Sequence, residues 1–211
     1  MSNPSISELV ARIRGSEPRL GSTRLVLVDG QAGAGKSSVT NRLAVALGGS
    51  PSNGAGSFRP DAPLAPSAPV QIVHGDDLYE GWGGLGTLDS VVIDQVLEPL
   101  AQRQAGGFRM LDWVEGQRTH EIAVPHRDYL IVEGVGVASP RARDLAVVTL
   151  FVEAPWATRL ERGIARDHMA YADVVERWEA FELDERERHE RTKAREAADW
   201  IIDGTAAIPD K

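Results

Sequence analysis

A glycine-rich segment near the N-terminus ends in a lysine and a serine. Residues 30–37 read Gly-Gln-Ala-Gly-Ala-Gly-Lys-Ser, which fits the pattern G-x-x-x-x-G-K-[S/T] at every defined position. In this pattern the glycines let successive backbone N–H groups point at phosphate oxygens, and the start of a helix adds partial positive charge. Lys36 would reach the β- and γ-phosphates, and the Ser37 hydroxyl would bind Mg²⁺. The segment therefore predicts a site for ATP with Mg²⁺.

The residues on either side must place this loop between a strand and a helix. Residues 25–28 form a continuously apolar run, as expected for a parallel strand that is buried on both faces. Residues 38–47 have the apolar periodicity of a helix. A chance Gly-Ala turn would lack these flanks, so we predict a strand–loop–helix unit. Its predicted phosphate-binding residues are Gly30, Ala32, Gly33, Ala34, Gly35, Lys36, Ser37 and Ser38.

Other elements follow along the chain. Short apolar runs with strand character lie at residues 70–74, 129–132, 147–152 and 200–202. Helical signals lie at residues 5–13, 88–100, 156–167 and 173–197. Pro99 should bend the second of these helices or end it near Glu98. Strands that alternate with helices predict an α/β protein with a parallel sheet covered on both faces.

Two segments stand outside this alternation. Residues 108–114 and 118–124 are predicted to form a small hairpin around a Glu-Gly turn, so the hairpin spans residues 108–124. Residues 48–69 are rich in Gly, Pro, Ser and Ala and have no periodicity. We predict a flexible surface loop there, either a disordered insertion or a flap over a substrate.

The composition excludes several classes of site and partner. The chain has 211 residues, so we expect a single domain over residues 1–211. It has no cysteine, which excludes disulfides and cysteine-based zinc sites. The net charge of −8 gives no electrostatic reason to bind nucleic acid or anionic membranes, and no apolar run approaches membrane-spanning length. We expect a cytoplasmic protein, and whether it forms a homo-oligomer stays open.

A pair of aspartates follows the second predicted strand. Asp76 and Asp77 lie just after residues 70–74, and ligands of open α/β sheets bind at the carboxyl ends of the strands. A carboxylate in this position can orient or deprotonate an attacking hydroxyl. The alternative is a helix cap or turn. Beside a phosphate-binding loop, we favour the chemical role.

In their order, the segments between residues 24 and 204 resemble the uridine kinase family, within the wider group that includes bacterial-type pantothenate kinase and phosphoribulokinase. Asp-Asp-Leu-Tyr at 76–79 is similar to that family's Asp-x-Phe-Tyr motif, and residues 130–135 look like its apolar strand ending in Glu-Gly. Residues 151–167 resemble its strand-to-lid segment, and residues 198–204 its closing Ala-Asp-x-Ile-Ile segment. The resemblance implies a P-loop NTPase fold: a parallel five-stranded sheet sandwiched by helices, a small β-hairpin and a helical lid at residues 155–172.

The resemblance also implies roles around the phosphates. Asp76 becomes the base for the acceptor hydroxyl and a candidate metal ligand, whereas Asp77 could serve Mg²⁺ through water. Glu133 takes a place on the Mg²⁺ side with Ser37, the alternative being an ordinary turn carboxylate. Tyr79 becomes a wall of the substrate pocket.

Arginines of the predicted lid supply further positive charge. Arg159, Arg162 and Arg166 are spaced to lie on one helical face, and the family's lid arginines close over the phosphates. We predict that Arg162 and Arg166 act with Lys36 on the transferring phosphoryl group, the alternative being a solvated helix face. The next helix carries opposite charges four residues apart, which predict a solvated face without function, at Glu182–Arg186, Asp184–Arg188 and Glu187–Arg191.

The acceptor side is where the chain departs from that family. The family's base-reading Tyr-Asp-Phe, followed by His and Arg, aligns here with Asp112, Trp113 and Arg118, but Leu111 and Gly116 replace its tyrosine and histidine. Asp112 could bind sugar hydroxyls, and Trp113 could stack on a ring or pack in the core. Arg118 could pair with Asp112 or meet an anionic substrate.

A tryptophan in a glycine-rich segment completes the predicted substrate site. Trp82 could cover the substrate or pin its loop, residues 80–86, to the core. The sequence thus predicts ATP-dependent phosphorylation of a small-molecule hydroxyl, by resemblance that of a nucleoside. A non-nucleoside acceptor such as a sugar, polyol or pantothenate-like compound is one alternative, and a nucleotide-binding regulatory module without transfer activity is another. The predicted substrate-binding residues are Asp76, Tyr79, Trp82, Asp112, Trp113 and Arg118.

Overall fold

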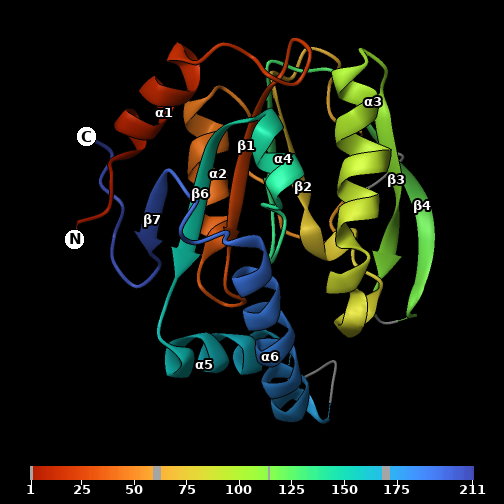
Figure 1. Cartoon of the computed structure of the whole chain (residues 1–211), viewed down its shortest axis with the longest axis vertical. Helices are drawn as coiled ribbons and strands as arrows, with labels where there is room; N and C mark the ends of the chain where they lie inside the picture. Colours follow the sequence, from red (N-terminus) through yellow and green to blue (C-terminus); the bar gives the residue numbers. More distant parts are fainter. Residues whose placement is uncertain (1, 59–62, 114, 168–171) are drawn as a thin grey trace.

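A parallel sheet forms the centre of the protein. The computed structural model describes residues 2–58, 63–113, 115–167 and 172–211. The sheet has five strands in the order β2-β5-β1-β6-β7, and every neighbouring pair is parallel (Figure 1). This confirms the predicted α/β class and five-stranded parallel sheet. The strands are β1 (Arg24–Gly30), β2 (Val70–His74), β5 (Tyr129–Glu133), β6 (Ala146–Glu153) and β7 (Trp200–Asp203).

Side chains of β1 alternate between two apolar cores. β1 pairs with β5 on one side and β6 on the other, and all its residues except Arg24 are buried. Leu25 and Leu27 belong to one core, whereas Val26 and Val28 belong to the other. Because both faces of this central strand are covered, its sequence is continuously apolar rather than alternating.

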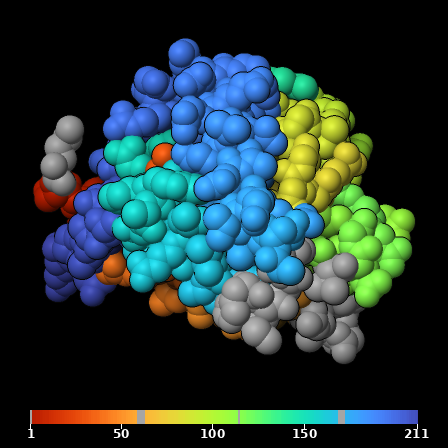
Figure 2. All heavy atoms as spheres, turned by 90° about the horizontal axis from the view of Figure 1, so that it is seen from below, coloured from red at the N-terminus to blue at the C-terminus, as the bar shows by residue number. Residues whose placement is uncertain are grey.

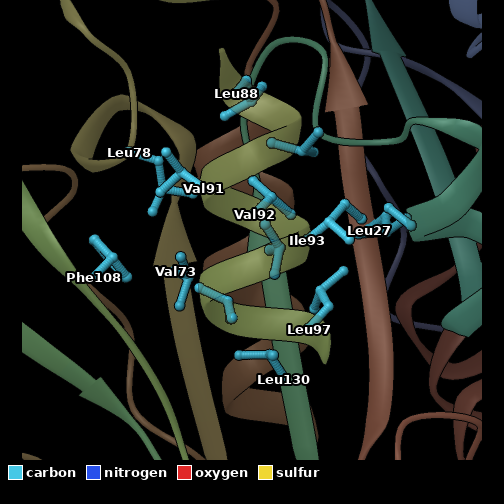
Figure 3. Close-up of a cluster of buried hydrophobic side chains, with 14 of the residues drawn as sticks. Leu27, Val73, Leu78, Leu88, Val91, Val92, Ile93, Leu97, Phe108 and Leu130 are labelled. Atoms are coloured by element: carbon cyan, nitrogen blue, oxygen red, sulfur yellow. The ribbon is translucent and has the colours of Figure 1, made fainter. Parts of the chain in front are cut away.

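Helices cover both faces of the sheet (Figure 1). α1 (Ile6–Gly15) and α2 (Lys36–Ala46) supply apolar side chains to the core that contains Val26 and Val28. Figure 3 shows the opposite core, where side chains of residues 88–97 meet Leu27, Val73 and Leu130 of three strands. The elements that supply this second core are η3 (Ser90–Leu97), α3 (Glu98–Ala101), α4 (Pro140–Leu145) and α6 (Val174–Thr192).

The predicted helix at residues 88–100 exists with a different geometry. Residues Ser90–Leu97 form a π-helix, and the Glu98 N–H donates to Ile93 O, five residues earlier. Pro99 does not end the helix near Glu98, because the chain continues directly from η3 into α3 and remains helical to Ala101. The buried face is broader than a 3.6-residue period predicts and consists of Val91, Val92, Ile93, Val96 and Leu97.

α6 ends earlier than the predicted helix over residues 173–197. Its last residue is Thr192, and Lys193 takes a left-handed φ of 54° that stops the helix. Asp199 N–H then donates to Thr149 O at 2.9 Å, and the Asp199 carboxylate accepts from Thr149 N–H at 2.8 Å. The chain must leave the helix at this point to pair with β6 as strand β7.

Shorter elements complete the fold. The predicted hairpin is present as β3 (Gly106–Asp112) and β4 (Gln117–Val124), which pair in antiparallel fashion; residue 114 lies outside the described residues. Two 3₁₀ segments, η1 (Gly75–Asp77) and η2 (Gly81–Gly86), follow β2. α5 (Trp156–Asp167) occupies the predicted lid, whose residues 168–171 lie outside the described part. None of the helices in the described ranges combines the length and apolar character that crossing a membrane requires.

The predicted loop at 48–69 is held to the rest of the protein over part of its length. Its described residues, 48–58 and 63–69, contain no helix or strand, and 59–62 are not described. Ser52 N–H donates to Asn41 Oδ1 at 2.8 Å, and Asn41 Nδ2 donates to Ser52 O at 2.9 Å. Gly56 N–H donates to Asp77 Oδ1 at 2.7 Å. These bonds join the segment to α2 and to the carboxyl end of β2.

α5 and α6 approach most closely at a glycine. Gly163 is buried, and a Cβ at this position would overlap the ring of Trp178, which is 2% exposed. We expect Gly163→Ala to lower the free energy of unfolding by about 1–3 kcal/mol, because a packed site must shift to admit a methyl group. Gly15→Ala is the matched control, since its Cβ would meet nothing within 4 Å. Urea denaturation measures both, and equal stabilities would contradict the close packing.

Candidate active site

The glycine-rich loop lies between β1 and α2, at the carboxyl end of the sheet. Gly30 has a φ of 132°, and a Cβ there would overlap the backbone of Val152 in β6. Gly33 has a φ of 73°, and its Cβ would lie 2.7 Å from Arg159 O. The two glycines therefore let the loop turn tightly against β6 and α5. Lys36 Nζ donates to Gly30 O at 3.0 Å and Gln31 O at 2.9 Å, across the loop.

A histidine, a serine hydroxyl and a glutamate carboxylate meet beside the start of α2. His74 and Glu133 are register partners at the ends of β2 and β5. His74 Nδ1 lies 2.6 Å from Glu133 Oε1, and Ser37 Oγ donates to the same oxygen at 3.2 Å. On its other side, His74 Nε2 lies 2.7 Å from Ser52 Oγ. The predicted metal-side pair, Ser37 and Glu133, is therefore in contact.

The electrostatics place Asp76 in the same group of charges. Burial and the charge of Glu133 raise the pKa of Asp76, against the opposing charges of Arg166, Lys36 and His74. Burial alone would raise the pKa of Glu133, but the hydrogen bond from His74 and the charges of His74 and Lys36 hold that pKa below its ordinary value. Asp76 is thus a carboxyl group whose affinity for a proton is increased, in the field of Lys36 from the glycine-rich loop.

The neighbouring aspartate has a different environment. Asp77 is buried and accepts the N–H of Gly56, which fixes one carboxylate oxygen to the 48–58 segment. Burial raises the pKa of Asp77 to about 6. Asp76 is only half-buried, and its side chain feels the charges of Lys36 and Arg166. The structure therefore separates the two carboxylates: Asp77 holds a loop, and Asp76 faces the cationic groups.

The lid arginines lie in three different places. Arg159 is 1% exposed and forms ion pairs with Glu182 at 2.7 Å and Glu185 at 2.9 Å. Arg162 donates to Gly33 O in the glycine-rich loop at 3.1 Å and to Gly204 O, after β7, at 3.2 Å. The guanidinium of Arg166 is paired with Asp167, and its charge acts on Asp76. The catalytic roles of Arg162 and Arg166 remain predictions.

A cavity opens beside Asp76. Its volume is about 440 Å³, and the Trp82 and Trp113 rings meet edge to face in it, with centroids 5.7 Å apart. Trp113 Nε1 donates to Asp76 O at 2.7 Å, and Arg118 donates to Leu78 O at 2.7 Å. The wall of the cavity is thereby tied to the segment that carries Asp76. The lining residues are Glu80, Gly81, Trp82, Leu111, Trp113, Gly116, Gln117, Arg118 and Arg177.

Two predicted substrate residues lie behind or beside this wall. Tyr79 is 1% exposed, donates to Val135 O at 2.6 Å and meets Trp113 edge to face at 6.3 Å. It supports Trp113 from the core side and does not line the cavity. The Asp112 carboxylate accepts the Glu115 N–H at 3.0 Å in the hairpin turn. Their contact with a substrate remains a prediction.

Some site residues had no role in the sequence-based predictions. His74 could have been found as a histidine at a strand end, directly before the aspartates. Glu185 and Arg188 gave no such signal, because their helix reads as a solvated charged surface. That expectation was wrong for Arg188, which is 3% exposed and pairs with Asp89 at 2.6 Å rather than with Asp184.

The carboxylates around Arg159 predict a pH effect on stability. Burial raises the pKa of Glu185 to about 7, whereas the hydrogen bond from Arg159 holds the pKa of Glu182 low despite burial. Between pH 4.5 and about 7 the folded protein therefore holds a proton on Glu185 that the unfolded chain has lost. The free energy of unfolding should fall as the pH rises through this window. Glu185→Gln should lose that part of the slope in urea denaturation, and identical slopes would contradict it.

The residues present fit ATP and Mg²⁺. Lys36 and the loop backbone offer donors for phosphate oxygens, and Ser37, Glu133 and Asp76 offer the hard oxygen ligands that Mg²⁺ takes. Within the described residues no group of three or more His, Cys, Asp or Glu could hold a metal by itself. A magnesium ion that shares its coordination with phosphates and water needs only one or two protein carboxylates.

Comparison with known proteins identifies the fold. No protein-family model matches this chain, and no curated protein matches it. A solved structure from Bacillus stearothermophilus, described as a possible uridine kinase, is 16% identical with a TM-score of 0.60, covering 94% of this chain and 97% of that one. A candidate fructose transport system kinase from Silicibacter sp. TM1040 is 20% identical with a TM-score of 0.60, covering 93% and 98%. The chain therefore has the α/β fold of these kinase structures, with the five-stranded sheet, flanking helices and small hairpin described above.

Proposed function

We propose that this protein is an ATP-dependent kinase that phosphorylates a hydroxyl group of a small, ring-containing molecule. One observation carries the proposal. The glycine-rich loop with Lys36 and Ser37 and the carboxylates of Asp76 and Glu133 lie together at the carboxyl end of the sheet, and Trp113 of a cavity of about 440 Å³ donates to the backbone of Asp76. A nucleotide site, a candidate base and an acceptor cavity in one place are what phosphoryl transfer requires.

The residues divide the reaction between them. The acceptor oxygen attacks the γ-phosphorus, the bond to the β-phosphate oxygen breaks, and ADP leaves. Asp76 takes or orients the proton of the attacking hydroxyl, and its raised pKa favours that role. Lys36 and Arg166 stabilise negative charge on the transferring group, and Arg162 holds the loop backbone. Mg²⁺, when held by Ser37 and Glu133, supplies further charge neutralisation.

The acceptor cavity favours a neutral ring. Trp82 and Trp113 offer apolar and π surface. Positive charge in the cavity is compensated, because Arg118 lies 4.0 Å from Glu80, and Arg177 pairs with Asp173 at 2.8 Å. A nucleoside, with a planar base and sugar hydroxyls, satisfies these features.

A sugar or another non-nucleoside alcohol is the second candidate. Leu111 and Gly116 line the cavity and offer no polar side chain to read a base. One of the two compared structures is a candidate fructose transport system kinase, whose fold this chain shares. An aromatic wall also stacks against the apolar face of a sugar ring.

A coupled assay of ADP release with Mg-ATP tests the proposal. The acceptor panel contains nucleosides, sugars and pantothenate-like alcohols, with Lys36→Ala as the control. Turnover with one acceptor class that is lost in the control would support a kinase and identify its substrate class. Binding of ATP without turnover across the panel would favour a nucleotide-binding regulatory module.

A further inference from the structure

Both backbone polar groups of one residue in the phosphate loop are held by buried side chains. Ala32 N–H donates to Glu185 Oε2 at 2.8 Å, and Arg159 donates to Ala32 O at 3.3 Å. The same two side chains are joined, since Arg159 also donates to Glu185 Oε1 at 2.9 Å. Ala32 precedes Gly33, where the loop turns against α5. The loop therefore depends on two side chains from outside the strand–loop–helix unit.

These side chains come from different helices. Arg159 lies on α5, the lid helix, and Glu185 lies on α6. Figure 2 shows α6 running along the face of the molecule with α5 on one side and the residues after β2 on the other. Both charged groups are 1% exposed, so water does not compete for their hydrogen bonds.

α6 also contacts the loop after β5, the strand that ends at Glu133. Arg188 donates to Gly136 O at 2.8 Å, just after Glu133 at the end of β5. His189 Nε2 lies 3.1 Å from Asp29 Oδ1, and this carboxylate oxygen also accepts the Gly136 N–H at 2.7 Å. One face of α6 thus contacts both the phosphate loop and the loop after Glu133.

We propose that Glu185 and Arg159 are positioning residues that hold the backbone of Ala32, and with it the phosphate loop, in the shape that binds nucleotide. The inference rests on the nucleotide site of the proposed function, but not on its acceptor. Because Arg159 belongs to α5, the same contact links the lid helix to the loop. Loss of the Glu185 contact would leave the Ala32 N–H without its carboxylate and loosen the loop.

Glu182 provides a matched control for this idea. It pairs with Arg159 from the same face of α6, as Glu185 does, but the phosphate loop contact to Ala32 N–H belongs to Glu185. If the carboxylates only neutralise Arg159, removing either one should have the same effect. If Glu185 positions the loop, only its removal should change nucleotide affinity.

The test measures ADP affinity by calorimetry for the full-length protein and its variants, without an acceptor. At pH 8, above the pKa of Glu185 of about 7, we expect Glu185→Ala to weaken ADP binding about 10-fold or more, the effect of losing a hydrogen bond to a charged group. Glu182→Ala should stay within about 2-fold of the unmodified protein. Glu185→Gln, which keeps an oxygen for the Ala32 N–H, should recover most of the affinity. In turnover, Glu185→Ala should raise KM for ATP while KM for the acceptor is unchanged.

Several outcomes would overturn the inference. They are equal losses of ADP affinity in Glu185→Ala and Glu182→Ala, or unchanged affinity in Glu185→Ala. Should Glu185→Ala fail to fold by circular dichroism, Glu185→Asp takes its place, since it keeps the charge but is one methylene too short for Ala32; an affinity like that of the unmodified protein would then refute the role. Failure of the proposed nucleotide site has a different signature, because ADP would then bind neither the unmodified protein nor any variant. Failure of the kinase activity alone would leave the ADP affinities, and this test, unchanged.

Discussion

Replacing Lys36 with alanine is expected to lower kcat/KM for ATP about 10³-fold. The Lys36 ammonium is buried in the proposed phosphate loop and reaches across it to Gly30 O and Gln31 O. An ammonium in a site with little water stabilises developing charge far more strongly than one in solution. Steady-state ADP release, with circular dichroism to verify folding, measures the loss.

Another lysine of the chain provides a matched control for Lys36. The only other lysines are Lys193, which ends α6, and Lys211 at the C-terminus. Lys211 is exposed, so Lys211→Ala removes the same charge from the protein without touching the loop. Its activity should stay within about 2-fold of the unmodified protein. A Lys36→Ala enzyme that folds and retains activity would contradict the assignment of the phosphate site.

Replacing Asp76 with asparagine is expected to lower kcat about 10³-fold and to leave ADP affinity nearly unchanged. The carboxyl group has a raised pKa and lies in the field of Lys36 and Arg166, next to the acceptor cavity. Asparagine keeps the shape and can accept a hydrogen bond, but it cannot take a proton. Pre-steady-state measurement of product formation would assign the loss to the chemical step.

The adjacent aspartate supplies the control. Asp77→Asn should retain an oxygen that accepts the Gly56 N–H, so the 48–58 segment stays in place. We expect its kcat to fall less than about 10-fold, because Asp77 is buried against that segment. Losses of equal size in the two variants, or a larger loss in Asp77→Asn, would contradict the choice of Asp76 as the base.

Local patterns were enough to predict the main elements. The strand, the glycine-rich loop and the helix around residues 30–37 could be predicted because the pattern consists of consecutive residues with fixed types. The continuously apolar β1 follows from burial on both faces, and the hairpin follows from two strands around a Glu-Gly turn. These features depend on residues that are neighbours in the chain, so they can be predicted without knowledge of the fold.

Element geometry was less predictable where distant contacts decide it. The periodicity at residues 88–100 predicted an ordinary α-helix. The segment packs against β1, β2 and β5 and forms a π-helix with a broader buried face. The helix predicted over 173–197 ends at Thr192 because Asp199 must reach Thr149 of β6, so that β7 can pair as the edge strand. Neither segment contains a residue type that indicates which distant residues it will pack against.

By itself, the sequence determined the α/β class, the glycine-rich loop between β1 and α2 and the position of the aspartates after β2. Only the tertiary structure decided what each charged side chain does. Arg159, Arg162 and Arg166 share one spacing, yet one is buried in ion pairs, one holds the loop backbone and one acts on Asp76. Spacing fixes which side chains share a helix face, but burial and hydrogen-bond partners depend on what packs against that face, which is chosen by residues far away in the chain.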